Sequence, residues 1–261
     1  RVALAARVSS VLTDLPVRGE IPTQTATRIQ EVIRKTLKTD DPFARLKEAQ
    51  LARFPEVSRW AMGLVEGSPD PWSAAVWVAG FGNIMDAGII EPETMEREVG
   101  SAAEGMRGYR LPPGFRERLL AAARIGVLLD NAGEAAFDVP LLSLLAARGK
   151  ALWLGVKGGA VIDDLTLPEA ERLGLSSFGE LVSNGNRAVG TDLALCPEDF
   201  RRRLSMSDLV LSKGQGNLET LAGRLPNAYF LLRCKCPVVS RAVGRPEGEL
   251  LLLDGDGRVA G

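Results

Sequence analysis

The sequence predicts an α/β protein, in which an N-terminal all-helical region is followed by a Rossmann-like, mostly parallel sheet with crossover helices. Two observations predict this class. Apolar residues recur at helical spacing up to about residue 124, and beyond that point short apolar runs alternate with helical segments. We therefore expect a helical domain over residues 1–124 and an α/β domain over residues 125–261.

The helical half is predicted from apolar periodicity and from prolines at helix starts. Ile29, Val32, Ile33 and Leu37 fall at positions i, i+3, i+4 and i+8 of one helix face. Several further segments open with a proline, which is favoured in the first turn of a helix. These segments predict helices over residues 42–54, 71–87, 92–105 and 113–123.

The second half is predicted from alternation. Apolar runs predict strands over residues 125–129, 151–156, 180–182, 208–211, 229–232 and 250–253. Helical patterns lie between most of these runs, over residues 134–147, 168–173, 197–204 and 218–225. In such sheets ligands bind outside the carboxyl ends of the strands, where helix N-termini expose unpaired NH groups. We therefore look for functional residues at these strand ends.

The composition of the chain limits the kinds of partner that the protein is expected to bind. The 32 Lys and Arg residues nearly balance the 33 Asp and Glu residues, so no basic field is available to hold a phosphate backbone. No run approaches the roughly 18 apolar residues of a membrane span. We expect a cytoplasmic protein that binds neither nucleic acid nor membranes, and the sequence leaves its oligomeric state open.

The chain contains no histidine and only three cysteines. Ser-His-Asp and Cys-His catalysis are thereby excluded. The cysteines are too few for a four-thiolate zinc site, so any metal site should use oxygen ligands.

Two strand ends carry side-chain oxygen atoms. Asp130 and Asn131 directly follow one predicted strand, and Asp163 and Asp164 follow the next one. The separation of about thirty residues is that of one βαβ unit, so Asp130 and either Asp163 or Asp164 are expected to meet. Oxygen ligands from two loops suit a hard divalent cation, although Asp and Asn at such positions also cap helices and close turns.

A third strand end combines glycines with a positive charge. Lys213 precedes Gly214, Gln215, Gly216 and Asn217. Glycines let backbone NH groups approach an anion, so phosphate is the expected ligand, and the alternative is a tight turn with a solvated lysine. The segment matches neither a Walker A loop nor a dinucleotide fingerprint.

Together these segments resemble the damage-control phosphatases, whose domain is also described as acidic-residue methyltransferase-like. The resemblance spans about Asp41 to Gly255 and follows six motifs in order: Asp41-Pro42-Phe43 with Lys47; Asp70-Pro71 with Gly82-Asn83 and Asp86; Leu129 to Glu134; Gly158-Gly159 with Asp163-Asp164; Lys213 to Asn217; and Lys235-Cys236-Pro237. It implies hydrolysis of phosphate monoesters with a divalent metal, in a cleft between a helical region and an α/β domain.

The resemblance also implies roles for single residues. Asp130, Asn131 and Asp164 match the family's metal ligands, and Lys213 and Asn217 match residues that line its phosphate site. Two further residues match a motif that faces the cleft, where they contact substrate or act as a structural cap: Asn83 and Asp86. Asp163 departs from the pattern, because Asn or Ser is usual there.

The expected activity is that of a phosphatase acting on small phosphorylated metabolites with Mn, Mg, Co or Ni. Asp130 or Glu134 would accept the proton of the attacking water, and Lys213 would stabilise charge on the phosphoryl group. One alternative has Asp130 attack as a nucleophile and form a phosphoaspartate. Others are a metal- and phosphometabolite-binding module without turnover and, less favoured, a methyltransferase-like cofactor binder.

Overall fold

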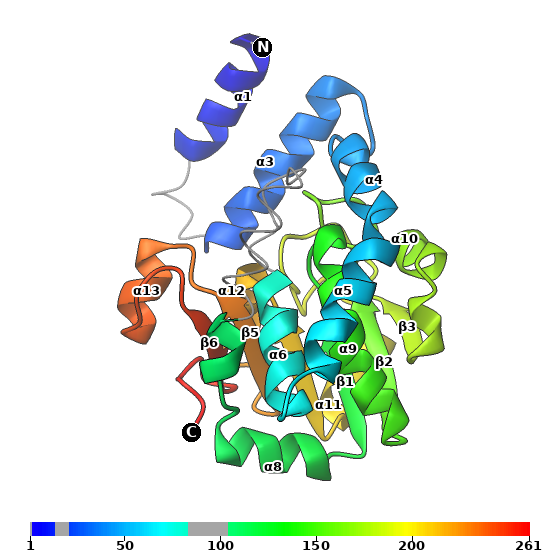
Figure 1. Cartoon of the computed structure of the whole chain (residues 1–261). Helices are drawn as coiled ribbons and strands as arrows, with labels where there is room; N and C mark the ends of the chain where they lie inside the picture. The colour runs from blue at the N-terminus through cyan, green and yellow to red at the C-terminus, as the bar shows by residue number, and fades with distance from the viewer. Residues whose placement is uncertain (1, 14–20, 83–103) are drawn as a thin grey trace.

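The computed structural model describes residues 2–13, 21–82 and 104–261 (Figure 1). Six strands form one sheet in the order β3-β2-β1-β4-β5-β6. The first five run parallel, and β6 is antiparallel to β5. The strands are β1 Arg124–Leu128, β2 Ala151–Val156, β3 Glu180–Ser183, β4 Leu209–Lys213, β5 Ala228–Arg233 and β6 Leu250–Leu253.

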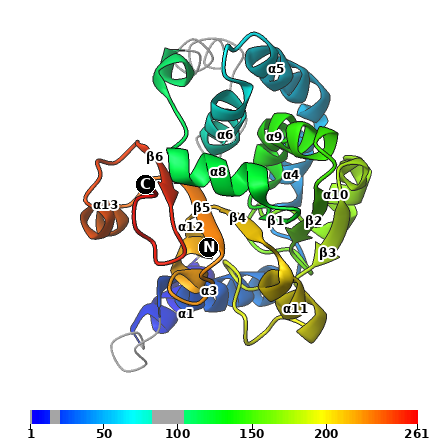
Figure 2. The same ribbon diagram turned by 90° about the horizontal axis from the view of Figure 1, so that it is seen from below.

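Helices cover both faces of this sheet. They are α1 Val2–Thr13, α3 Pro22–Leu37, α4 Ala44–Ala52, α5 Phe54–Glu66, α6 Pro71–Phe81, α8 Pro113–Ala121, α9 Ala135–Ala147, α10 Leu167–Arg172, α11 Glu198–Met206, α12 Gln215–Leu221 and α13 Pro237–Val243, with 3-10 turns η2 Ala132–Glu134 and η3 Leu175–Ser177. Figure 2 shows α5, α6 and α9 on one side of the sheet and α11 on the other.

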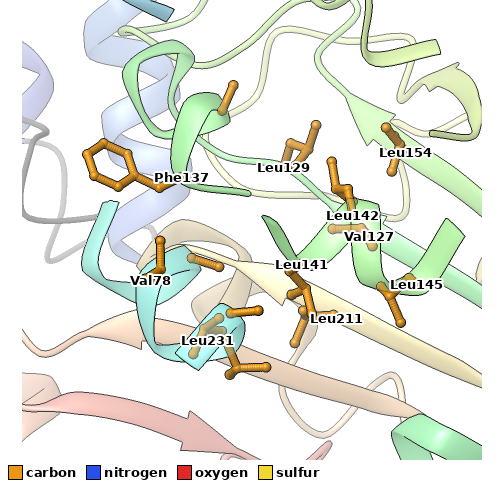
Figure 3. Close-up of a cluster of buried hydrophobic side chains, with 14 of the residues drawn as sticks. Val78, Val127, Leu129, Phe137, Leu141, Leu142, Leu145, Leu154, Leu211 and Leu231 are labelled. Carbon is orange, nitrogen blue, oxygen red and sulfur yellow. The ribbon is translucent and has the colours of Figure 1, made fainter. Parts of the chain in front are cut away.

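Alternation along the strands divides the interior into two hydrophobic cores. In β4, Leu209 and Leu211 face the helices α5, α6 and α9, whereas Val210 faces α11 and α12. Figure 3 shows the first core, in which Val78 of α6 and Leu142 of α9 gather over the strands. Every strand except β3 is largely buried, and a strand that is buried on both faces has an almost continuously apolar sequence.

The sheet order places a topological switch point at β1. Its neighbour β2 lies on one side and β4 on the other, so the carboxyl ends of these three strands are adjacent. Helix α4 packs against η2 beyond the end of β1, and α3 packs against α12 beyond the end of β4 (Figure 1). This edge is the expected ligand-binding position of an open α/β sheet.

The predicted fold class is confirmed, and all six predicted strands are present within two residues of their expected ends. The largest error lies in the helical region, where the sequence prediction omitted α5. The boundary between residues 124 and 125 stays a prediction. The larger core contains side chains from both sides of it, such as Ala61 and Phe115 with Leu142 and Leu211. Most of the predicted helix 92–105 lies outside the described residues.

Candidate functional site

Main-chain hydrogen bonds join the loops that follow β1 and β2. Leu165 N donates to Asp130 O at 2.8 Å, and Ala132 N donates to Asp163 O at 2.8 Å. Between these bonds Asn131 and Asp164 form an isolated antiparallel bridge. The structure therefore brings together the two loops that the sequence singled out, with Asp130, Asn131 and Asp164 at their junction.

Asp130 lies against the start of α12. Gly214 has a φ of +84°, and a Cβ atom at this glycine would stand only 1.8 Å from Asp130 Oδ2. Asp130 is only partly buried as a residue, and its carboxylate has no hydrogen bond or ion pair within the described ranges. Burial and the negative charges of Asp164 and Glu134 raise the pKa of Asp130 well above its ordinary value.

Asp164 is held by a lysine that the sequence analysis overlooked. Lys157 directly follows β2, and its Nζ lies 3.2 Å from Asp164 Oδ2. The same ammonium donates to the carbonyl oxygens of Ala188, at 2.9 Å, and Gly190. Lys157 and Asp164 are only 3% and 6% exposed, so this ion pair is shielded from solvent. The sequence did contain one signal for Lys157, because this residue directly follows a predicted strand at the same edge of the sheet as Asp130.

Asp163 turns to the neighbouring loop. Asn131 Nδ2 donates to Asp163 Oδ2 at 3.4 Å, which helps to set the orientation of the Asn131 amide. The residue before it, Ile162, has a φ of +46°. This is a strained conformation for a β-branched side chain, and such strain is concentrated at functional sites. The two aspartates are thus held differently, as expected for adjacent residues.

Lys213 is enclosed, not solvated. Its Nζ donates to Glu134 Oε2 at 2.9 Å and Asp138 Oδ1 at 2.8 Å, and the side chain is 0% exposed. Burial alone would lower the pKa of Lys213, but the two carboxylates hold it above its ordinary value. Burial also raises the pKa of Asp138 to about 6 in spite of the adjacent ammonium. The alternative of a solvated lysine in a tight turn is wrong.

Hydrogen bonds also hold the side chain of Asn217. Its Nδ2 donates to Lys213 O at 2.8 Å, and its Oδ1 accepts from Thr191 Oγ1 at 2.7 Å. The side chain is buried and fixes the main chain on either side of Gly214. The remaining residues expected to contact substrate, Asn83 and Asp86, lie outside the described residues.

The motif that begins at Asp41 supports the site from the helical region. Lys47 of α4 is buried, and its Nζ lies 2.6 Å from Asp41 Oδ2 and 2.8 Å from Glu169 Oε1. Glu169 also accepts hydrogen bonds from Thr166 N and Oγ1, which caps α10. Because Thr166 follows the Asp164 loop, this buried ion pair links α4 to that loop.

The donor atoms fit a hard divalent cation. Within the described ranges no three His, Cys, Asp or Glu side chains form a metal-binding group, so a cation at this junction would use two carboxylates and the Asn131 amide. Such oxygen ligands suit Mg or Mn. Crowded carboxylates are costly without a counter-ion, and Asp130 lacks a pairing partner among the described side chains. A cation would relieve this repulsion.

Comparisons with known proteins identify relatives over most of the chain. The profile of the damage-control phosphatase ARMT1-like domain matches residues 1–251. A damage-control phosphatase of Archaeoglobus fulgidus is 33% identical over 234 residues, which span 87% of this chain and 80% of the relative. A damage-control phosphatase of Pyrococcus horikoshii is 31% identical over 225 residues, which span 84% of this chain and 76% of the relative.

A solved structure shares the fold. The crystal structure of a DUF89 family protein from Pyrococcus horikoshii aligns with a TM-score of 0.80 at 27% sequence identity. The alignment covers 98% of this chain and 91% of that one.

The fold and site define an α/β protein with ionisable groups gathered at the switch point of a parallel sheet. The chain belongs to the ARMT1-like damage-control phosphatase family. Membership supports a phosphatase role on damaged metabolites and confirms the resemblance found in the sequence. No described helix is long and apolar enough to cross a membrane.

Proposed function

We propose that this protein is a divalent-metal-dependent phosphatase that hydrolyses small phosphate monoesters, such as sugar phosphates or damaged phosphometabolites. The observation that carries the proposal is the pairing of the loops after β1 and β2, which joins Asp130, Asn131 and Asp164. Family membership supplies the reaction class, and these side chains supply the proposed metal ligands.

Asp130, Asn131 and Asp164 would hold Mn, Mg, Co or Ni through oxygen atoms. When bound, the ion supplies positive charge that polarises a phosphoryl oxygen and lowers the pKa of an attacking water. The chain's own residues orient the substrate and move the proton. The sequence has no histidine, and we assign the role of the base to a carboxylate.

Asp130 is better placed than Glu134 to accept that proton. Asp130 is only partly buried, and its carboxylate makes no hydrogen bond or ion pair within the described ranges, so it is available to accept a proton. Glu134 is 1% exposed and already accepts a hydrogen bond from Lys213. We assign Asp130 the proton transfer and Glu134 a positioning role.

Lys213 and Asn217 would then form part of the phosphate site at the end of β4. Asn217 holds the carbonyl of Lys213, and this bond fixes the strand end that presents Gly214 to Asp130. We retain a phosphate contact for both residues as a proposal, together with substrate contacts from Asn83 and Asp86. Substitution of these residues should affect the binding and turnover of the substrate more than the affinity for the metal.

Attack by Asp130 to form a phosphoaspartate is the main mechanistic alternative, because the carboxylate makes no hydrogen bond or ion pair within the described ranges. Rapid acid quench after incubation with a phosphate ester separates the two mechanisms. Water attack predicts no phosphorylated protein, whereas the alternative predicts a base-labile phosphate on Asp130.

A panel of phosphate monoesters tests the function. The protein is stripped with a chelator, then assayed for phosphate release after addition of Mn, Mg, Co or Ni. The proposal predicts no turnover in the stripped protein, recovery with at least one ion, and loss of recovery in Asp130→Asn. Ligand binding without turnover across the panel would instead favour a non-catalytic binding module, and full activity after stripping would refute metal dependence.

A further inference from the structure

Lys157 is the ammonium in direct contact with a proposed metal ligand. It lies 3.2 Å from Asp164 Oδ2, and the carbonyl oxygens of Ala188 and Gly190 hold it from the segment after β3. Its side chain is 4% exposed, so solvent screens its charge weakly. The lysine is thus fixed in place within the site.

The other buried lysine of the site is differently placed. Lys213 lies between Glu134 and Asp138, each within 2.9 Å of its Nζ, so two negative charges face one positive charge. Within the described ranges, Lys157 contacts one carboxylate and two uncharged carbonyls. Its positive field at the metal ligands is therefore less cancelled than that of Lys213.

This difference between the two lysines is important because the surrounding side chains carry an excess of negative charge. The side chains grouped at this edge include more carboxylates than lysines: Asp130, Glu134, Asp138, Asp163 and Asp164 against Lys157 and Lys213. A phosphate monoester carries nearly two negative charges near neutral pH. A divalent ion alone does not offset the five carboxylates, so binding of a dianion also depends on the positive charge of the lysines close to the ion.

We propose that Lys157 is the electrostatic determinant that lets this site accept a phosphate dianion beside the metal. The proposal rests on the proposed function, because it assumes a cation held by Asp130 and Asp164. It assigns Lys157 a positioning and charge-balancing role without contact with the phosphate. Lys213, by contrast, is paired with both Glu134 and Asp138, which offset its charge.

The proposal predicts that loss of the Lys157 charge weakens the binding of phosphate but does not weaken the binding of Mn²⁺. Removal of a positive charge beside Asp164 favours binding of a cation and opposes binding of an anion. A purely structural role for Lys157 predicts a different result, because damage to the loops weakens both. The sign of the change in metal affinity therefore separates the two roles.

The test uses the full chain, Mn²⁺ and inorganic phosphate. Calorimetric titration measures the Kd of Mn²⁺ for the stripped protein and then the Kd of phosphate for the Mn-loaded protein, in the wild type and in Lys157→Met. Lys150→Met is the matched control. Lys150 lies at the opposite end of β2, and its ammonium is also held by two carbonyls, those of Leu120 and Ala122.

For Lys157→Met we expect the Kd of phosphate to rise by at least about tenfold, which corresponds to about 1.4 kcal/mol. The Kd of Mn²⁺ should stay equal or fall. Lys150→Met should leave both constants unchanged. Unchanged phosphate affinity in folded Lys157→Met, or a weakened Mn²⁺ affinity, would overturn the assignment.

Two further measurements keep the proposal testable if Lys157→Met does not fold. Lys157→Arg retains the charge and should bind phosphate within about threefold of the wild type, a difference of about 0.7 kcal/mol. Mn-loaded wild type should also prefer phosphate to the monoanion dimethyl phosphate by more than about tenfold. Equal affinities for the two anions would refute the Lys157 proposal, whereas failure of the wild type to bind Mn²⁺ would refute the proposed function itself.

Discussion

Gly214→Ala, compared with a control glycine variant, should distinguish the effect of displacing Asp130 from the effect of lower stability of the fold. A methyl group at residue 214 would stand 1.8 Å from Asp130 Oδ2, whereas real Cβ atoms essentially never come closer than 3.0 Å to such an atom. Residue 214 and the carboxylate must therefore move apart by about 1.2 Å. Because Asp130 is a proposed metal ligand and base, this shift should disable the site.

The magnitude follows from two separate costs. Gly214 has φ 84° and ψ 157°, a region open almost only to glycine, so alanine there should cost of order 1–3 kcal/mol of stability. A misplacement of about 1 Å at reacting groups costs roughly a hundredfold in rate. We expect kcat/KM to fall by about two orders of magnitude and Mn²⁺ affinity to weaken.

Gly223→Ala is the control. Gly223 has a φ of +74°, but an added Cβ would meet nothing within 4 Å. It should lose stability in urea denaturation while it keeps activity and Mn²⁺ affinity. If folded Gly214→Ala keeps wild-type activity and metal binding, the position assigned to Asp130 is not required and the reasoning fails.

Four other substitutions test further side chains. Asp164→Asn should lose most phosphatase activity while Asp163→Asn stays close to wild type in an Mn-supplemented assay, and the reverse order would show that the wrong aspartate was chosen. Lys213→Met should lower the free energy of unfolding by about 3–5 kcal/mol, because it leaves buried carboxylates without their cation; a loss below about 1 kcal/mol in urea denaturation would contradict this. Burial raises the pKa of Asp70, but hydrogen bonds from Arg116 and Ser73 lower it to about 2 from 3.8. The folded pKa is thus depressed, so the stabilisation by Asp70 is present above about pH 4 and lost as the pH falls toward about 2. Wild type and Asp70→Asn should differ in stability at pH 7 and converge near pH 2, and a constant difference would contradict the assignment.

The sequence predicted the sheet well because its signals are local. Each buried strand is a short apolar run, and each run ends at polar residues or glycine. The rule that ligands bind at the carboxyl edge then selected the loops with Asp130 and Asp164, which the structure joins by main-chain hydrogen bonds. Helix α5 was missed, although Val57, Ala61, Leu64 and Val65 follow helical spacing, because only Arg53 separates it from α4.

The partners of the lysines could not be predicted, because tertiary contacts determine them. Lys157 is held by carbonyls about thirty residues further along the chain, and Lys213 reaches carboxylates more than seventy residues before it. No local pattern distinguishes such a lysine from a solvated one at a strand end. The structure therefore shows two things that the sequence could not: Lys213 is buried among carboxylates, and Lys157 is part of the site.

Anomalous diffraction from a crystal soaked in Mn²⁺ tests the central claim most directly, because it locates the ion without reference to activity. The account predicts a manganese peak bounded by oxygen atoms of Asp130, Asn131 and Asp164, and its loss in crystals of Asp130→Asn. A peak at another position that persists in Asp130→Asn would contradict the proposed site, as would an ordered crystal of active protein with no peak at this junction.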